Sequence, residues 1–203
     1  MNPGKTVVID YQTGNLNSVC KSLRAAGADL LVTMEPEDLQ QAARIVLPGV
    51  GHFASTERLL TSGMGDALRK RVTEGVPFLG ICVGLQWLFA GSTEAPATPG
   101  LGIFPEICDR FPAGIKSPHV GWNSLELVGE SRLLQGLPAS PFVYFTHSYR
   151  AERVYATTAV TNYGGEFSAV IEKGNWMAVQ FHPEKSGSVG LAILENFMRL
   201  QAC

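Results

Sequence analysis

The residues Gly80-Ile81-Cys82-Val83-Gly84 place one cysteine between two glycines, where an apolar run meets a helix-like stretch. In the related turn G-x-S-x-G, a nucleophile occupies a tight bend between strand and helix and projects above the edge of the sheet. The positive end of a helix dipole favours a thiolate at this position, and the backbone N–H of Val83 can donate to an oxyanion. The alternative is a buried, inert cysteine, as most free cysteines are.

A nucleophilic cysteine needs a base, and His182 is the best placed of the four histidines. It follows the apolar run WMAVQF, where a strand would leave the sheet, a usual position for active-site groups in open α/β folds. Pro183 biases His182 toward extended backbone, in which Glu184 would project to the same side. The pattern therefore predicts a Cys–His–Glu triad, with the carboxylate orienting the imidazole. The other histidines are ambiguous by residue type alone: His52, His119 and His147.

The segment LPGVG, residues 47–51, ends another apolar run with two glycines. Because glycine tolerates unusual φ angles, the peptides of this segment can turn toward a neighbouring strand end. The segment therefore offers a second oxyanion donor, although a plain Pro-Gly turn has the same composition.

Continuous apolar runs alternate with amphipathic stretches in the first half of the chain. Such strands are typical of a parallel sheet that is covered on both faces. We expect Asn17 to cap the first helix and Gly27 to stop it. The predicted strands are 5–10, 28–33, 44–49 and 76–81, and the predicted helices are 17–26, 36–42, 53–74 with a break at Gly63–Gly65, and 83–91.

The second half contains mostly strand candidates and closes with a helix from Gly187 to Leu200. The candidates are 102–110, 119–127, 142–147, 155–161, 166–172 and 175–181. We therefore predict one α/β domain over residues 1–203, with an open, mixed, mainly parallel sheet and helices on both faces. Its first half would form the parallel core, and its second half would add antiparallel strands.

Composition excludes several classes of partner. A net charge of −2 with 17% charged residues argues against binding to nucleic acid or a membrane surface. The four cysteines, at 20, 82, 108 and 203, form no CxxC pair, so no metal site is expected. No GxxxxGK[ST] loop is present, and the apolar runs are too short for a signal peptide or a membrane span. We expect a cytoplasmic protein with free thiols and no cofactor.

Taken together, the motifs LPGVG, LGICVGLQ and VQFHPEKSG resemble those of the class I (triad) glutamine amidotransferases. That family has a flavodoxin-like α/β core, and its cysteine attacks the side-chain amide of glutamine and releases ammonia. The resemblance implies that Cys82 is the nucleophile, His182 the base and then the acid, and Glu184 the orienting carboxylate. It also implies an oxyanion hole from the backbone of Val50, Gly51 and Val83, and glutamine contacts from Gln86, His147, Ser148 and Tyr149.

Three further stretches resemble the glutaminase subunits of imidazole glycerol phosphate synthases of the histidine pathway. They are IDYQTGNLNSV (9–19), PHVGWN (118–123) and YFTHSY (144–149). This resemblance implies a heterodimer with a (β/α)8-barrel cyclase, which receives the ammonia and makes imidazole glycerol phosphate and AICAR. Trp122, Asn123 and Tyr144 would lie toward that cyclase. The family also implies a peptide at Val50 whose N–H points away until the cyclase binds its substrate.

Two other functions remain open at this point. The first is the glutaminase subunit of another synthase, of anthranilate, GMP or pyridoxal phosphate, which has the same chemistry and a different partner. PHVGWN and GNLNSV argue against it. The second is a non-catalytic, redox-sensing domain on the same fold, but a sensor needs no His-Pro-Glu sequence.

Overall fold

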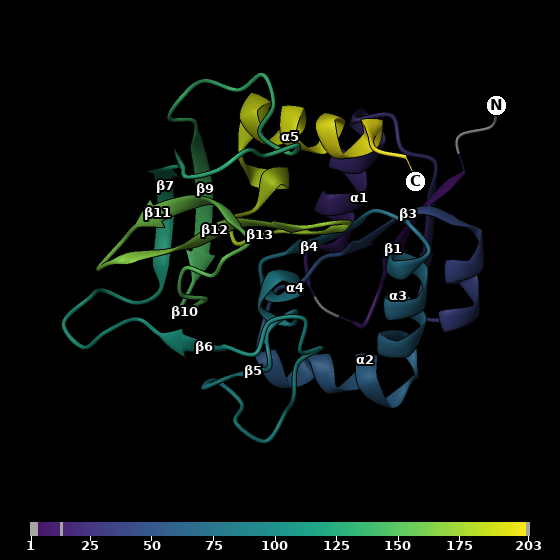
Figure 1. Cartoon of the computed structure of the whole chain (residues 1–203), viewed down its shortest axis with the longest axis horizontal. Coiled ribbons are helices and arrows are strands. Elements are labelled where there is room, and N and C mark those ends of the chain that lie inside the picture. The colour runs from purple at the N-terminus through teal and green to yellow at the C-terminus, as the bar shows by residue number, and fades with distance from the viewer. Residues whose placement is uncertain (1–3, 13, 202–203) are drawn as a thin grey trace.

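The computed structural model describes residues 4–12 and 14–201 and is built around an eight-stranded sheet (Figure 1). The strand order is β2-β1-β3-β4-β13-β12-β11-β8. The first five strands are parallel: β2 (Leu30–Thr33), β1 (Lys5–Ile9), β3 (Ala42–Leu47), β4 (Phe78–Ile81) and β13 (Trp176–Val179). The last three continue the sheet in antiparallel fashion: β12 (Glu166–Lys173), β11 (Thr157–Asn162) and β8 (Glu126–Leu127). The predicted mixed, mainly parallel α/β sheet is confirmed.

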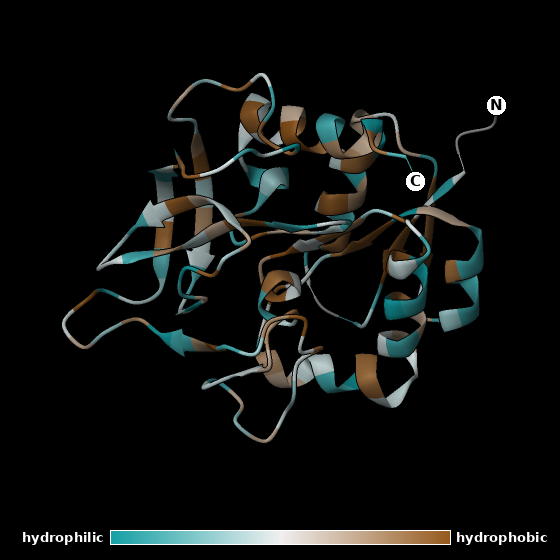
Figure 2. Ribbon diagram, viewed as in Figure 1, coloured by the Kyte–Doolittle hydropathy of each residue, from teal (hydrophilic) through white to brown (hydrophobic). Residues whose placement is uncertain are grey.

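Helices cover both faces of this sheet (Figure 1). One face carries α1 (Leu16–Ala25) and α5 (Gly187–Arg199), and the other carries α2 (Glu57–Thr61), α3 (Met64–Thr73) and α4 (Val83–Gln86). The described residues also form the 3₁₀ helices η1 (Pro36–Gln41), η2 (Phe53–Thr56) and η3 (Pro183–Lys185). The parallel strands between the helix layers are mostly apolar (Figure 2), and Val7, Ile45 and Leu79 have no exposed surface. Burial on both faces explains why these strands do not alternate polar with apolar residues.

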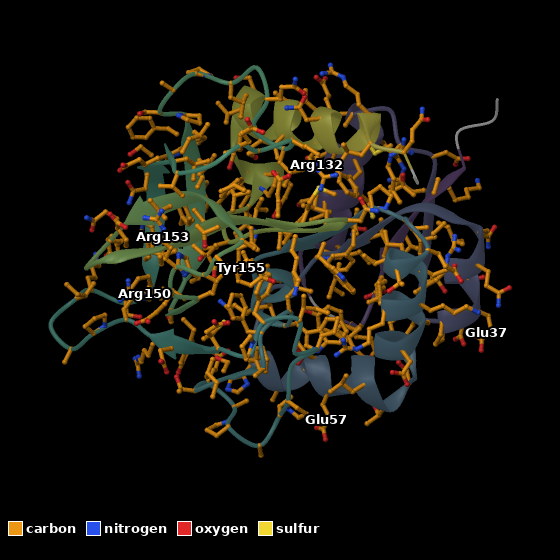
Figure 3. The ribbon with its side chains drawn as sticks, viewed as in Figure 1. Glu37, Glu57, Arg132, Arg150, Arg153 and Tyr155 are labelled. Carbon is orange, nitrogen blue, oxygen red and sulfur yellow. The ribbon has the colours of Figure 1, made fainter. Side chains whose placement is uncertain are left out.

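Two smaller sheets lie outside the main sheet, and their strands β6, β7, β9 and β10 are at the end of the molecule away from β1 (Figure 1). One has the order β10 (Tyr149–Arg150), β6 (Ile107–Arg110), β5 (Gly91–Ser92), and the other pairs β7 (His119–Ser124) with β9 (Phe142–His147). Among the charged side chains labelled in Figure 3, Arg150 and Arg153 lie at the left-hand end of the molecule, whereas Glu37 lies at the opposite, right-hand end.

The expected division between a parallel first half and antiparallel additions is wrong for β13. This late strand pairs in parallel with β4, residue Trp176 beside Phe78. The pairing satisfies the backbone groups of β4, which would otherwise lie at an open edge. The core therefore needs both ends of the chain.

Two helix boundaries also differ from the prediction. Asn17 does not cap α1, because the N-cap is Asn15, whose left-handed φ of 70° lets the chain enter the helix from a turn. The helix expected over 83–91 ends at Gln86. Beyond it, the carbonyl groups of Trp87 and Leu88 accept hydrogen bonds from N–H groups of residues 101, 103 and 104, so tertiary contacts replace the helical ladder.

Cys20, Cys82 and Cys108 are buried and free, while Cys203 lies outside the described residues. In the part of the chain that the structure describes, no helix combines the length and the apolar character that a bilayer crossing requires.

Candidate active site

The carboxyl ends of β3, β4 and β13 meet at one edge of the sheet, and the predicted site residues follow them. LPGVG begins at the last residue of β3, Cys82 follows β4 and His182 lies just beyond β13. Cys82 is tied to the neighbouring strand, because its N–H donates to the carbonyl of Val179 at 2.8 Å. The parallel pairing of β4 with β13 thus brings together two segments a hundred residues apart in sequence.

Cys82 sits in a strained turn between β4 and α4. Its backbone angles are φ 55° and ψ −106°, outside the regions that side chains normally adopt. Such a conformation costs on the order of 1–3 kcal/mol and persists only when the surroundings enforce it. Here the carbonyl of Cys82 accepts from the N–H groups of Leu85 and Gln86, so the strained residue also opens the helix.

The two flanking glycines are required by close backbone contacts. A Cβ atom on Gly80 would lie 2.5 Å from the carbonyl oxygen of Gly84, and one on Gly84 would lie 2.2 Å from that of Leu47. Both distances are too short for a non-bonded contact, so a residue with a Cβ atom does not fit at either position. Because these two positions carry no side chain, β4, the turn and α4 pack closely together. The Cys82 thiol therefore projects out of the sheet.

His182 and Glu184 form a buried pair. The Nδ1 atom of His182 lies 2.7 Å from Oε1 of Glu184, and the two side chains are 1% and 0% exposed. The His182 backbone is extended as predicted, but Glu184 belongs to the 3₁₀ helix η3. The expected i, i+2 alternation of an extended segment is therefore wrong, and the turn of η3 brings the carboxylate back to the ring.

The environment of His182 favours the imidazolium. Burial alone would lower its pKa, but the nearby Cys82 sulfur, and then the Glu184 carboxylate, outweigh burial and raise the pKa to about 10. The Nε2 atom of His182 is buried and makes no hydrogen bond of ordinary geometry within the described residues. This nitrogen is consequently left for proton exchange with the thiol and with a substrate.

The oxyanion donors are not both available in this conformation. The N–H of Val83 points at the carbonyl oxygen of Gly49, 3.4 Å away. Because the C=O and N–H of a trans peptide point in opposite directions, the N–H of Val50 points away from the N–H of Val83. A Cβ on Gly49 would lie 2.8 Å from that of Val83, and Gly51 has a φ of 111°, so both glycines are required here.

A pocket of about 470 Å³ opens beside Cys82. It is lined by eight of the residues predicted from sequence: Val50, Gly51, Cys82, Val83, Gln86, His147, Ser148 and Tyr149. His182 and Glu184 are not among the residues that line this pocket, and His182 interacts with the lining residue Cys82. The arrangement suits a small polar ligand whose reacting end meets the thiol.

Two of these residues have their polar groups committed within the protein. The Nε2 of Gln86 donates to the carbonyl of Tyr149 at 2.9 Å and contacts Oε1 of Gln180 at 3.2 Å, which leaves Oε1 of Gln86 for a ligand. His147 donates from Nδ1 to the same Tyr149 carbonyl at 2.9 Å, and its Nε2 meets Nδ1 of His119 at 3.2 Å. Burial lowers the pKa of His147 to about 3 and that of His119 to about 4.

The three residues expected at a partner surface lie on β7 and β9. Trp122 and Tyr144 are cross-strand partners on the outer face of this two-stranded sheet, and Trp122 is 55% exposed. Asn123 projects to the other face, where its amide contacts His119 and donates to the carbonyl of Asn162. His52, in contrast, accepts from the N–H of Ala54 at the start of η2 and does not line the pocket.

Sequence reasoning missed several polar residues at the site. Asn15 donates to Oε1 of Glu184 at 2.5 Å, and Gln180 contacts the Cys82 sulfur. Glu94 and Lys185 line the pocket, and Glu94 also accepts from the N–H of Phe53. Only Gln180 could have been noticed from the sequence, because it is a polar residue within the apolar run WMAVQF. The others reach the site through contacts between segments that are distant in sequence.

Comparison with known proteins gives a consistent result. The chain matches the family described as "Glutamine amidotransferase class-I" over residues 7–200. The "Imidazole glycerol phosphate synthase subunit HisH" of Methanothermobacter thermautotrophicus is 47% identical over 194 residues, covering 95% of this chain and 97% of that one. The chloroplastic "Imidazole glycerol phosphate synthase hisHF" of Arabidopsis thaliana is 43% identical over 198 residues, covering 94% of this chain and 33% of that longer protein.

Solved structures share the fold at lower sequence similarity. "Structure of PurLQS from Thermotoga maritima" superposes with a TM-score of 0.76 at 16% identity, covering 97% of this chain and 98% of that one. At this identity the likeness concerns the fold alone.

Proposed function

Because the chain belongs to the class I glutamine amidotransferases, we propose that it hydrolyses glutamine to glutamate and ammonia as the glutaminase subunit of an imidazole glycerol phosphate synthase, in histidine biosynthesis. One observation carries the chemistry. Cys82 lines the pocket and interacts with His182, whose ring Nδ1 lies 2.7 Å from the carboxylate of the buried Glu184. The relatives named as this subunit, which match nearly end to end, support the choice of synthase.

The reaction follows from these groups. The Cys82 thiolate attacks the side-chain carboxamide carbon of glutamine and forms a tetrahedral oxyanion. His182, held as imidazolium by the thiolate and by Glu184, donates its proton to the departing ammonia, which leaves a γ-glutamyl thioester. The neutral imidazole then takes a proton from water, whose oxygen attacks the thioester carbon. The bond between that carbon and the Cys82 sulfur breaks, which releases glutamate and restores the Cys82 thiolate and the His182 imidazolium.

Activity would depend on rotation of the peptide between Gly49 and Val50. In the described conformation the Gly49 carbonyl occupies the position that the oxyanion needs. Rotation would present the N–H of Val50 beside that of Val83 and complete the hole. Because loss of one oxyanion donor typically lowers kcat by about 10²–10³, this conformation corresponds to a low-activity state.

The partner subunit would bind beside the pocket. Val120, Trp122 and Phe142 are each more than half exposed on the outer face of the β7–β9 sheet. Thr146 of the same face lines the pocket wall. We propose that this face receives a (β/α)8-barrel cyclase, into which the ammonia passes directly. The much longer Arabidopsis relative, which the chain matches over 33% of its length, supports a close association with a second functional unit.

The decisive experiment uses the chain alone and mixed with its cyclase. Glutaminase activity should be low for the chain alone and rise by about 10² or more when the cyclase and its substrate are added, as expected for one recovered oxyanion donor. Cys82→Ala should abolish glutamine-dependent synthesis and leave synthesis from ammonium salts intact, because only the source of ammonia is lost. Full glutaminase activity in Cys82→Ala, or support of a different synthase instead of this one, would overturn the proposal.

A further inference from the structure

Gln180 is a buried amide in an apolar setting. It follows β13 directly, lies between the buried residues Val179 and Phe181, and has no exposed surface. Its Nε2 lies 3.6 Å from the sulfur of Cys82, and its Oε1 lies 3.2 Å from Nε2 of Gln86. A buried amide without partners is costly, so its contacts determine how it is oriented.

The orientation of this amide follows from a chain of contacts that begins at Tyr149. A backbone carbonyl can only accept, so the Gln86 atom 2.9 Å from the Tyr149 oxygen must be the NH₂ group. The same NH₂ group reaches Gln180, so the Gln180 atom facing it must be the carbonyl oxygen. The NH₂ group of Gln180 is thereby directed at Cys82 and cannot be flipped without two donors meeting.

We propose that Gln180 is a positioning residue for the nucleophile: its N–H holds the Cys82 sulfur and stabilises the thiolate, and Gln86 couples this amide to the Tyr149 carbonyl in the pocket wall. Donation to an anion is stronger than donation to a neutral group, so the contact favours thiolate over thiol. Through these two amide side chains, a movement of the Tyr149 segment on ligand binding would also shift the donor that contacts the Cys82 sulfur.

This inference rests on the proposed function for its role in turnover, but thiolate stabilisation can be measured without glutamine. The rate at which iodoacetamide alkylates Cys82 is followed across pH by the mass of the peptide that contains it. In Gln180→Met, which keeps the volume and removes the donor, alkylation near neutral pH should slow about tenfold, and its pH profile should move to higher pH. Gln180→Glu should show a larger change, because a carboxylate can still accept from Gln86 but repels the thiolate.

A matched control separates positioning from core stability. Ser168→Ala removes a buried hydroxyl from β12 that contacts Thr157 at 2.7 Å and donates to the Glu152 carbonyl, away from Cys82. It should lower the free energy of unfolding by an amount similar to Gln180→Met and leave the alkylation profile unchanged. In the complex with the cyclase, Gln180→Met should lower kcat with little change in KM for glutamine.

Specific outcomes would overturn the inference. One is that the pH profile of alkylation in Gln180→Met is the same as in the unaltered chain. If Gln180→Met does not fold, the same comparison is made with Gln180→Glu. Another is a slowing that Ser168→Ala reproduces. If Cys82→Ala retained glutaminase activity, the proposed function would fail, whereas the alkylation result would still decide the contact between Gln180 and Cys82.

Discussion

The carboxylate of Glu184 is oriented by a residue from the other end of the chain. Asn15 donates to its Oε1 at 2.5 Å, the same oxygen that faces His182. Asn15 is the N-cap residue of α1 with a left-handed φ of 70°, but its side chain makes no capping hydrogen bond and instead reaches Glu184. Asparagine suits this position because it tolerates left-handed backbone better than most residues do.

Asn15→Gly tests this arrangement cleanly, since glycine keeps the backbone conformation and removes only the amide. We expect kcat to fall about tenfold or more, the usual cost of removing a hydrogen bond to a charged group, while the fold is retained. In Asn15→Asp, kcat should fall further, because two carboxylates would then face each other. Steady-state glutaminase kinetics of the activated complex measure both. If kcat were unchanged in both variants, Asn15 would not contribute to catalysis.

The paired histidines His119 and His147 predict how stability depends on pH. Their pKa values in the folded chain are about 4 and about 3, against 6.5 for an unperturbed histidine, because both are buried. Between about pH 3 and 6.5 the unfolded chain therefore binds more protons, and the free energy of unfolding falls as the pH is lowered through this window. His182 has its pKa raised, so its contribution is complete below pH 6.5 and is lost only toward pH 10.

Urea unfolding at several pH values between 4 and 7 measures this slope. His119→Phe preserves the aromatic stack with Tyr163, whose ring centroid lies 4.0 Å away, and removes one titrating group. Its slope should be shallower by up to about 1.4 kcal/mol per pH unit, the value for one proton. Equal slopes in the two proteins would show that His119 titrates normally.

At the scale of elements, the turn between β4 and α4 depends on its glycines. Gly84→Ala places a Cβ 2.2 Å from the Leu47 carbonyl, so β3 and α4 must separate. We expect a loss of at least about 2 kcal/mol in the free energy of unfolding, measured in urea, together with loss of activity. Gly91→Ala is the matched control, because its nearest contact would be an ordinary 3.6 Å. A similar cost for both variants would contradict the close-contact explanation.

Elements buried on both sides were predictable from sequence, and features set by tertiary contacts were not. The run of residues 76–81 is apolar because helices cover both of its faces, so it was recognised as a strand. The early end of α4 could not be foreseen, because residues 101–104 supply the N–H groups that end it. The pairing of His182 with Glu184 was predicted, but the turn of η3 that produces it was not.

At the scale of the whole molecule, the two ends of the chain complete a single sheet. Strand β13 joins β4, and α5 packs beside α1 on one face (Figure 1). Because late elements bury early ones, we propose that the chain folds as one domain over its full length. The site is likewise assembled from distant parts of the chain, since Asn15, Cys82 and Glu184 come from the beginning, middle and end of the sequence.

The outer face of the β7–β9 sheet is where the whole molecule would meet its partner. Trp122 is 55% exposed there beside Tyr144, with ring centroids 6.1 Å apart, and such aromatic residues often dominate binding energy. Trp122→Ala should weaken binding to the cyclase by about tenfold or more, measured by isothermal titration calorimetry. Tyr155→Ala is the control, since Tyr155 is 75% exposed but lies outside this sheet, against Phe104 and Lys173 (Figure 3). If Tyr155→Ala weakened binding and Trp122→Ala did not, the partner would sit on a different face, and ammonia released at Cys82 would need another route.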